Sequence, residues 1–127
     1  MKFIATALTL ATVAAATNVR FDPVYNTVGE STDVVACSNL ADKFPTLDSF
    51  PTFPSVGGSQ VITSFADADC GTCFSITFNG KSQFFTAIDV AKDGVVTSQT
   101  SFSQLANINN GVINASVVKV AGSHCGM

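Results

Sequence analysis

Five aspartates near the ends of predicted strands carry most of the side-chain chemistry that this sequence offers. They are Asp22, Asp67, Asp69, Asp89 and Asp93. Asp89 closes an apolar run at 84–88, and the alternation of side chains along a strand directs it to the face opposite Ile88. A carboxylate at a strand end can line a groove on a barrel or cap a turn, and the residues alone leave both roles open.

Enzymatic chemistry has few other side chains to draw on. The single histidine, His124, adjoins Cys125, so a Ser-His-Asp triad would have to run through the C-terminal tip of the chain. The sequence contains no H-E-x-x-H motif, no phosphate-binding glycine loop and no set of histidines for a metal. We therefore expect neither a metal nor a cofactor. Glycoside hydrolysis would require a second carboxyl group to act with Asp89, for which Asp22, Asp69 and Asp93 are the candidates.

Residues 1–16 have the features of a secretory signal peptide. Lys2 supplies a positive charge, residues 3–13 are mostly apolar, and the alanines at 14–16 are the small residues that signal peptidase requires. A buried N-terminal helix is the alternative. Cleavage after Ala16 would leave one domain, 17–127, secreted into the medium or retained in the cell wall. That domain has no apolar run long enough to span a membrane, and the net charge of the full chain, −3, does not suit binding to nucleic acid.

Four cysteines in a short secreted chain predict two disulfides rather than thiols or a zinc site. A bond between Cys70 and Cys73, in the sequence C-G-T-C, would close a strained small ring, so each is expected to pair with Cys37 or Cys125. Spacing does not choose between the two remaining schemes. A redox role for C-G-T-C would need a following helix. Residues 74–78 instead alternate as a strand, with Phe74, Ile76 and Phe78 facing inward.

The remaining elements are short and mostly strands. Further runs rich in Val, Ile, Phe or Thr predict strands at 19–25, 33–37, 60–65, 84–89, 95–98 and 116–121. Asn79-Gly80 predicts a hairpin between the strand at 73–78 and the one that follows. Short helices are expected at 38–44 and at 100–107, the second capped by Thr100 or Ser101. The sequence therefore predicts an all-β barrel with two or three short helices.

One N-glycosylation sequon occurs in the chain, at Asn114-Ala115-Ser116. It precedes the last predicted strand and follows Asn109-Asn110-Gly111, a sequence typical of an exposed turn. We expect Asn114 to be accessible to glycosylation in a secreted protein.

From Val19 to Met127 the chain resembles the cerato-platanin family of small secreted fungal proteins. The matching segments are F-D-P-V-Y at 21–25, V-A-C-S-N at 35–39, F-P-T-L at 44–47, F-P-S-V-G-G at 53–58, C-G-T-C at 70–73, A-I-D at 87–89 and C-G at 125–126. The resemblance implies a six-stranded double-ψ β-barrel like the N-terminal domain of expansins. It also implies the pairings Cys37 with Cys70 and Cys73 with Cys125. Where the family commonly has Trp after C-G-T-C, this chain has Phe74, and it contains no Trp.

The same resemblance implies a function that needs no covalent step. Family members bind chitin-related oligosaccharides, loosen cellulosic material without hydrolysis, are surface-active and elicit plant defence, and Asp89 aligns with the aspartate associated with loosening. We therefore expect a monomer that binds chitin oligomers or cellulose, assembles at interfaces and is recognised by hosts as an elicitor or allergen. The expected polysaccharide site consists of Asp89, Asp22, Tyr25, Ser38, Asn39, Gly71 and Thr72.

Three features of that expectation stay open. Tyr25, the single tyrosine, could stack on a sugar ring or belong to the core. A true endoglucanase is one alternative function, and an amphiphilic surface-assembling protein is another. Hydrophobins carry eight cysteines, so the four in this chain exclude that family.

Overall fold

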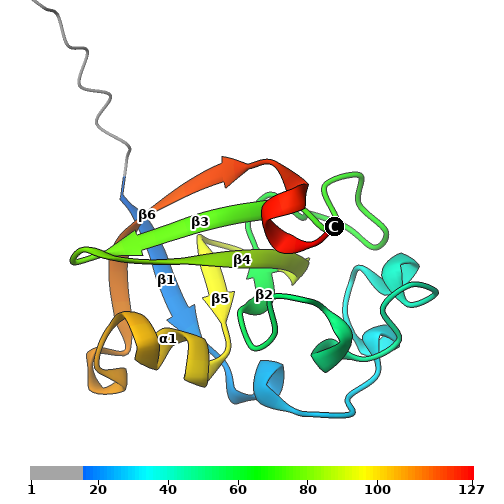
Figure 1. Ribbon diagram of the computed structural model, residues 1–127, viewed down its shortest axis with the longest axis horizontal. Helices are drawn as coiled ribbons and strands as arrows, with labels where there is room; N and C mark the ends of the chain where they lie inside the picture. The colour runs from blue at the N-terminus through cyan, green and yellow to red at the C-terminus, as the bar shows by residue number, and fades with distance from the viewer. Residues whose placement is uncertain (1–15) are drawn as a thin grey trace, which may run out of the picture.

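Six strands form a closed barrel in the computed structural model, which describes residues 16–127 (Figure 1). The strands are β1 (Thr17–Phe21), β2 (Val56–Ser59), β3 (Cys73–Phe78), β4 (Lys81–Val90), β5 (Val95–Thr97) and β6 (Val112–Val120). Their order around the barrel is β1-β5-β2-β4-β3-β6, with β1–β5 and β2–β4 parallel and the other pairs antiparallel. The predicted six-stranded barrel is confirmed. Residues 1–15, most of the predicted signal peptide, lie outside the described residues.

The hairpin between β3 and β4 forms where Asn79-Gly80 predicts it. Both residues have positive φ angles, 52° and 80°, which is the requirement of the two-residue turn that matches strand twist. Phe78 pairs with Lys81 across the turn, so Lys81 begins the return strand. Phe74 and Ile76 point into the core as expected, and Phe78 packs against it from a half-buried position.

The strand predicted at 60–65 is wrong, because the barrel uses β2 immediately before it. A Cβ atom on Gly57 would lie 2.0 Å from the backbone oxygen of Val96, so only glycine lets β2 approach β5 this closely. Glycine is a weak strand former, and the sequence pattern therefore favoured the β-branched residues downstream. In the structure that segment leaves the barrel, with Ile62 buried and Phe65 exposed.

The strand predicted at 33–37 and the helix predicted at 38–44 are also wrong. Each forms a single 3-10 turn, Thr32–Val34 and Ser38–Leu40. The first turn begins where the Ser31 hydroxyl accepts a hydrogen bond from the Asp33 N–H, a local bond that competes with strand pairing. The chain between the turns lies along β4, and the Cys37 N–H donates to the Ile88 oxygen at 3.0 Å.

The single α-helix of the described residues, α1 (Gln99–Leu105), begins one residue before the helix predicted at 100–107 and ends two residues before it. Its N-cap is Ser98, whose hydroxyl accepts from the Ser101 N–H at 3.0 Å, so the expected caps Thr100 and Ser101 are wrong. Phe102 and Leu105 bury the helix face that periodicity predicts. The 3-10 turns are η1 (Pro23–Asn26), η2 (Thr32–Val34), η3 (Ser38–Leu40), η4 (Leu47–Ser49), η5 (Ile108–Asn110) and η6 (Gly122–Cys125).

Two disulfides tie the loops to the barrel, and their pairing is the one that the family resemblance implied. Cys37 is bonded to Cys70, 33 residues away, and Cys73 to Cys125, 52 residues away. In the hydrophobic core, which the barrel strands, α1 and the loops build together, the largest fully buried aromatic and aliphatic side chains are Phe50, Phe85, Phe102, Leu47, Ile62, Ile76 and Ile88. Among residues 16–127 no helix is long and apolar enough to cross a membrane.

Gly94, in the turn before β5, allows a close approach that a side chain would block. Its φ is +65°, and a Cβ atom would lie 2.0 Å from the backbone oxygen of Asn18. Backbone strain and overpacking together should make Gly94→Ala about 2–5 kcal/mol less stable. Gly111→Ala is the control, because φ is +70° there but no atom lies within 4 Å, and it should lose about 1–2 kcal/mol. Urea denaturation measures the loss of folding free energy in both variants. Equal losses would contradict the claim that a side chain at Gly94 is blocked by the backbone of Asn18.

Candidate functional site

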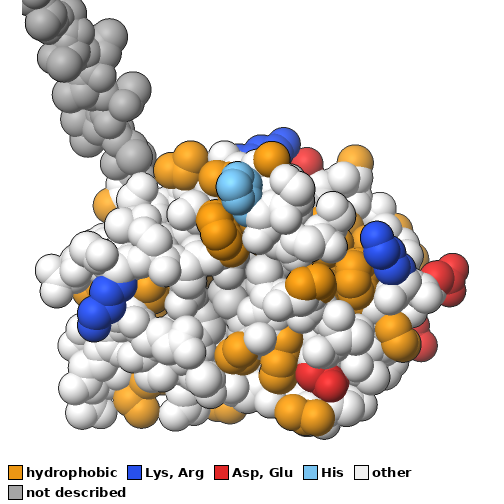
Figure 2. Space-filling view, in the orientation of Figure 1, with side chains coloured by type: hydrophobic (Ala, Val, Ile, Leu, Met, Phe, Trp, Pro, Cys, Tyr) orange, Lys and Arg blue, Asp and Glu red, His pale blue; other side chains and the backbone are white. Residues whose placement is uncertain are grey.

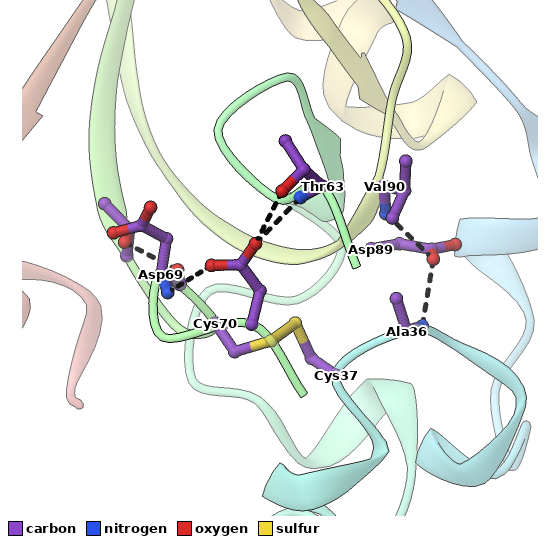
Figure 3. Close-up of a disulfide and its surroundings, with 9 residues drawn as sticks. Ala36, Cys37, Thr63, Asp69, Cys70, Asp89 and Val90 are labelled. Carbon is purple, nitrogen blue, oxygen red and sulfur yellow. Dashed lines mark hydrogen bonds between the residues drawn. A yellow bond between two sulfur atoms is a disulfide. The ribbon is translucent and has the colours of Figure 1, made fainter. Parts of the chain in front are cut away.

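Asp89 lies near the end of β4, on the rim of the barrel beside the Cys37–Cys70 disulfide (Figure 3). The register of β4 against β2 shifts there, because Gly57 pairs with Ala87 but Gly58 pairs with Asp89. Ile88 is thereby an extra residue in the strand, and its side chain is fully buried while that of Asp89 is half-buried. Such bulges commonly redirect a side chain at a barrel rim.

The protein itself donates three hydrogen bonds to the Asp89 carboxylate. One oxygen, Oδ1, accepts from the backbone N–H groups of Ala36 at 3.0 Å and Val90 at 2.9 Å, as Figure 3 shows. The other, Oδ2, accepts from the Tyr25 hydroxyl at 2.7 Å. A carboxylate has about four acceptor positions, so one remains for a donor from outside. Asp89 therefore joins β4, η1 and the segment before Cys37, and keeps limited capacity for a ligand.

Tyr25 belongs to the core rather than to an exposed stacking surface. Only 6% of the residue is exposed, and its hydroxyl is directed to Asp89. Burial raises the pKa of the Tyr25 hydroxyl, and the hydrogen bond to Asp89 and the negative charges of Asp89 and Asp22 raise it further. Of the two roles that the sequence left open for Tyr25, the structure supports the core aromatic.

The raised pKa of Tyr25 predicts a loss of stability in alkali. In the unfolded chain the hydroxyl ionises near pH 10, but the folded protein keeps it neutral to higher pH. The unfolded state therefore loses the proton first, and the stabilising contribution falls as pH rises above about 10. Tyr25→Phe should lack this part of the pH dependence. Tyr25 is the single tyrosine and the chain has no Trp, so ultraviolet absorbance reports its ionisation directly. Ionisation of the folded wild type near pH 10 would contradict the prediction.

The other expected site residues surround Asp89 through the backbone rather than through their side chains. Asp22 is exposed and caps η1, with its Oδ1 accepting from the Val24 N–H at 2.9 Å. Gly71 and Thr72 pair with the backbone of Ala87, two residues before Asp89. Ser38 and Asn39 form η3 directly after Cys37, and the Cys37–Cys70 disulfide links that turn to Gly71. Asp89 and Tyr25 are the two expected residues whose side chains meet.

Sequence reasoning missed two partners of Asp89, the backbone N–H groups of Ala36 and Val90. Backbone donors leave no signal in residue type, and Ala36 lies 53 residues from Asp89 in the chain. The contact depends on the chain before Cys37 lying beside β4, whereas the 33–37 segment was expected to be a strand.

The remaining aspartates stabilise local structure at the surface. Asp93 accepts from the Asn18 amide at 2.8 Å and lies 3.8 Å from Arg20. Asp67 accepts from the backbone N–H groups of Asp69 and Thr63, and these bonds lower the pKa of the Asp67 carboxyl. Asp22, Asp69 and Asp93 are exposed, whereas burial is what keeps the general acid of a glycosidase protonated. None of the three has the surroundings of an acid partner for Asp89.

The His124 side chain packs against β4 at Phe84, five residues before Asp89. Its ring stacks on that of Phe84 with centroids 4.9 Å apart, and both residues are exposed. The pale-blue histidine and an adjoining hydrophobic side chain are visible on the face in Figure 2. No three His, Cys, Asp or Glu residues gather as a possible metal site in the part of the chain that the structure describes.

Barrel and rim together define a class of small disulfide-bonded proteins: a closed six-stranded mixed sheet, two long disulfide loops, and a rim carboxylate bound to a buried tyrosine. The chain belongs to the cerato-platanin family, whose family model matches residues 17–127. The proteins of this family are secreted fungal proteins.

Known proteins agree with this assignment in sequence and in structure. The Allergen Asp f 15 of Aspergillus fumigatus is 32% identical over 115 residues, which cover 85% of this chain and 76% of that protein. The crystal structure of cerato-platanin 2 from M. perniciosa has a TM-score of 0.84 at 37% identity, covering 88% of this chain and 99% of that one. The solution structure of the fungal elicitor Cerato-Platanin has a TM-score of 0.76 at 34% identity, covering 85% and 95%. These relatives are named as an allergen and an elicitor, not as hydrolases.

Proposed function

We propose that this chain is a secreted, wall-associated protein that binds chitin or cellulose and loosens polysaccharide contacts without cutting glycosidic bonds. The observation that carries the proposal is the rim carboxylate of Asp89, fixed by three protein donors and without a buried carboxyl partner. A fixed acceptor with one open position can bind a sugar hydroxyl. Loosening requires only binding energy directed at hydroxyl groups that would otherwise join neighbouring polysaccharide chains.

Hydrolysis would need more than Asp89 supplies. A glycosidase uses two carboxyl groups about 5 to 9.5 Å apart, one of them protonated as the acid. The exposed positions of Asp22, Asp69 and Asp93 do not favour a protonated acid. Asp89 already accepts from Ala36, Val90 and Tyr25, so it is poorly placed to take a proton from water as a general base.

Co-sedimentation with insoluble chitin and cellulose tests the binding that loosening requires. We expect a fraction of the wild-type protein to pellet with the polymer and to be released by soluble oligosaccharide of the same kind. Asp93→Asn removes a negative charge from an exposed residue that is paired with Arg20, and it should pellet as wild type does. Recovery of all wild-type protein in the supernatant at every polymer concentration would refute the proposal.

Recognition by hosts belongs to the same proposal. Relatives of this chain are named as an allergen and as a fungal elicitor. We expect the purified, folded protein to induce a defence response in leaf tissue, and protein with both disulfides reduced and alkylated to induce less. The same response from buffer or from an unrelated disulfide-bonded protein would show that the induction is not specific.

N-glycosylation of Asn114 is expected when the chain passes through a secretory pathway. The residue is exposed, but it lies within β6 opposite Asn18 rather than in the turn before the strand. Its side chain points away from the barrel, because the neighbours Ile113 and Ala115 are buried. Intact mass of the natively secreted protein should fall after endoglycosidase treatment, and Asn114→Gln should remove that difference. An unchanged mass would refute occupancy.

A further inference from the structure

An open cleft of about 540 Å³ lies between η1 and α1, and Asp89 is not among the residues that line it. Pro23 and Asn26 form one wall, and Gln99, Thr100 and Ser103 form the other. In Figure 1 this region is at the lower rim of the barrel, where α1 and the 3-10 turn after β1 lie below the strands. Ligand sites in proteins commonly have volumes of about 300–1,000 Å³, so the cleft is large enough for a small-molecule unit.

Among the described residues, no side chain that lines the cleft can ionise. The lining consists of amides, hydroxyls and apolar groups, the last supplied by Pro23, Ala106 and Ile108. In Figure 2 the surface over α1 is likewise largely uncharged. Amides and hydroxyls match the hydroxyl edges of a neutral sugar, and apolar groups match its C–H faces. An anionic or cationic ligand would find no counter-charge there.

The η1 wall of the cleft is fixed from both sides. On one side Tyr25 donates to Asp89 at 2.7 Å. On the other, the Asn26 side-chain oxygen Oδ1 accepts from the Gln99 backbone N–H at 2.8 Å, and the Asn26 side-chain amide donates to the Thr100 hydroxyl at 2.6 Å. A wall held in this way loses little freedom when a ligand binds, which favours affinity. The Gln99 amide makes no hydrogen bond to any residue that the structure describes, so it is available to a ligand.

We propose that the cleft between η1 and α1 is a second sugar subsite, which binds a neutral β-linked pyranose unit. The inference rests on the proposed polysaccharide-binding function and adds a contact surface that does not include Asp89. Asp89 then has two roles, as an acceptor on the rim and as a positioning residue that holds η1 through Tyr25. Chitin and cellulose chains share the ligand chemistry, and their soluble hexasaccharides distinguish the two sources.

Amide chemical shifts and binding titrations with chitohexaose and cellohexaose test the subsite. The test variant is Ser103→Leu, which fills the cleft with a side chain that makes no hydrogen bond. Gln104→Leu is the matched control, because Gln104 is exposed on the same helix but does not line the cleft. In wild type we expect shifts at 23–26 and 99–108. Ser103→Leu should weaken binding of at least one hexasaccharide by about tenfold or more, while Gln104→Leu binds as wild type.

The outcomes separate this inference from the proposed function. Hexasaccharide binding that is equal in Ser103→Leu and wild type, with shifts confined to the surroundings of Asp89, would overturn the subsite and leave polysaccharide binding intact. Absence of wild-type binding to either hexasaccharide and to both insoluble polymers would overturn both. Equal weakening in Ser103→Leu and Gln104→Leu would show a general effect on α1 and would also overturn the subsite. Weaker binding of only one of the two hexasaccharides by Ser103→Leu, with Gln104→Leu unchanged, supports the subsite and identifies the preferred sugar.

Discussion

Asp89→Asn is expected to reduce the loosening of cellulose fibres to background while the barrel stays folded. The asparagine oxygen can still accept from the N–H groups of Ala36 and Val90, and its amide can donate to the Tyr25 oxygen. The charge is lost, however, and charge-assisted hydrogen bonds are about twice as strong as neutral ones. We expect a cost of about 1–2 kcal/mol in folding free energy and loss of the ionised acceptor that a sugar hydroxyl would use.

Two further measurements show whether that loss comes from Asp89 itself. Asp93→Asn makes the same change of charge at an exposed residue paired with Arg20, and it should loosen fibres as wild type does. The hydrogen bond and charge of Asp89 both raise the pKa of Tyr25, so Asp89→Asn should shift the ionisation of Tyr25 to lower pH. Full loosening activity in Asp89→Asn would place the active surface elsewhere on the barrel.

Removal of the Cys73–Cys125 disulfide should produce the largest loss of stability. The bond closes a loop with a sequence separation of 52, and loop-closure entropy gives about 4 kcal/mol for such a length. Domains of this size have total stabilities of about 5–15 kcal/mol. The double variant Cys73→Ala with Cys125→Ala should therefore lose a large share of its stability and unfold at a markedly lower temperature. It should also loosen the packing of η6 against β3, because this disulfide is the covalent link between Cys73 in β3 and Cys125 in η6.

Urea denaturation of the two double variants checks this estimate. Cys37→Ala with Cys70→Ala opens a loop with a separation of 33, and it should cost nearly the same, because the entropy depends only on the logarithm of length. A loss below about 1 kcal/mol in either variant would contradict a covalent origin for much of the stability.

The sequence predicts the barrel best where local signals and tertiary packing agree. β3, the Asn79-Gly80 turn and the buried face of α1 follow from alternation, positive φ angles and helical periodicity. The strand β2 does not, because Gly57 and Gly58 serve a close approach to β5 and β4 that only the assembled barrel requires. Segment 33–37 has β-branched residues, but Ser31 caps a 3-10 turn at its start. The end of the segment then lies beside β4 without forming a strand of the sheet.

Of the candidate site, the sequence identifies Asp89 but not what surrounds it. The run before Asp89 and the family resemblance both point to that residue. Its partner Tyr25 lies 64 residues earlier, and no periodicity relates two positions so far apart. The backbone donors to Asp89 and the cleft beside α1 arise only when η1 and the segment before Cys37 pack against β4 and α1. Residue types alone do not predict that packing.

Fibre loosening and sugar release, measured on the same cellulose sample with wild-type protein, test the central claim most directly. A non-hydrolytic binding protein should weaken or swell the fibres while soluble reducing ends stay at the level of a buffer control. Asp89→Asn, assayed in parallel, should change neither quantity from that control. Soluble reducing ends that accumulate with wild-type protein and disappear with Asp89→Asn would contradict the claim and identify an endoglucanase.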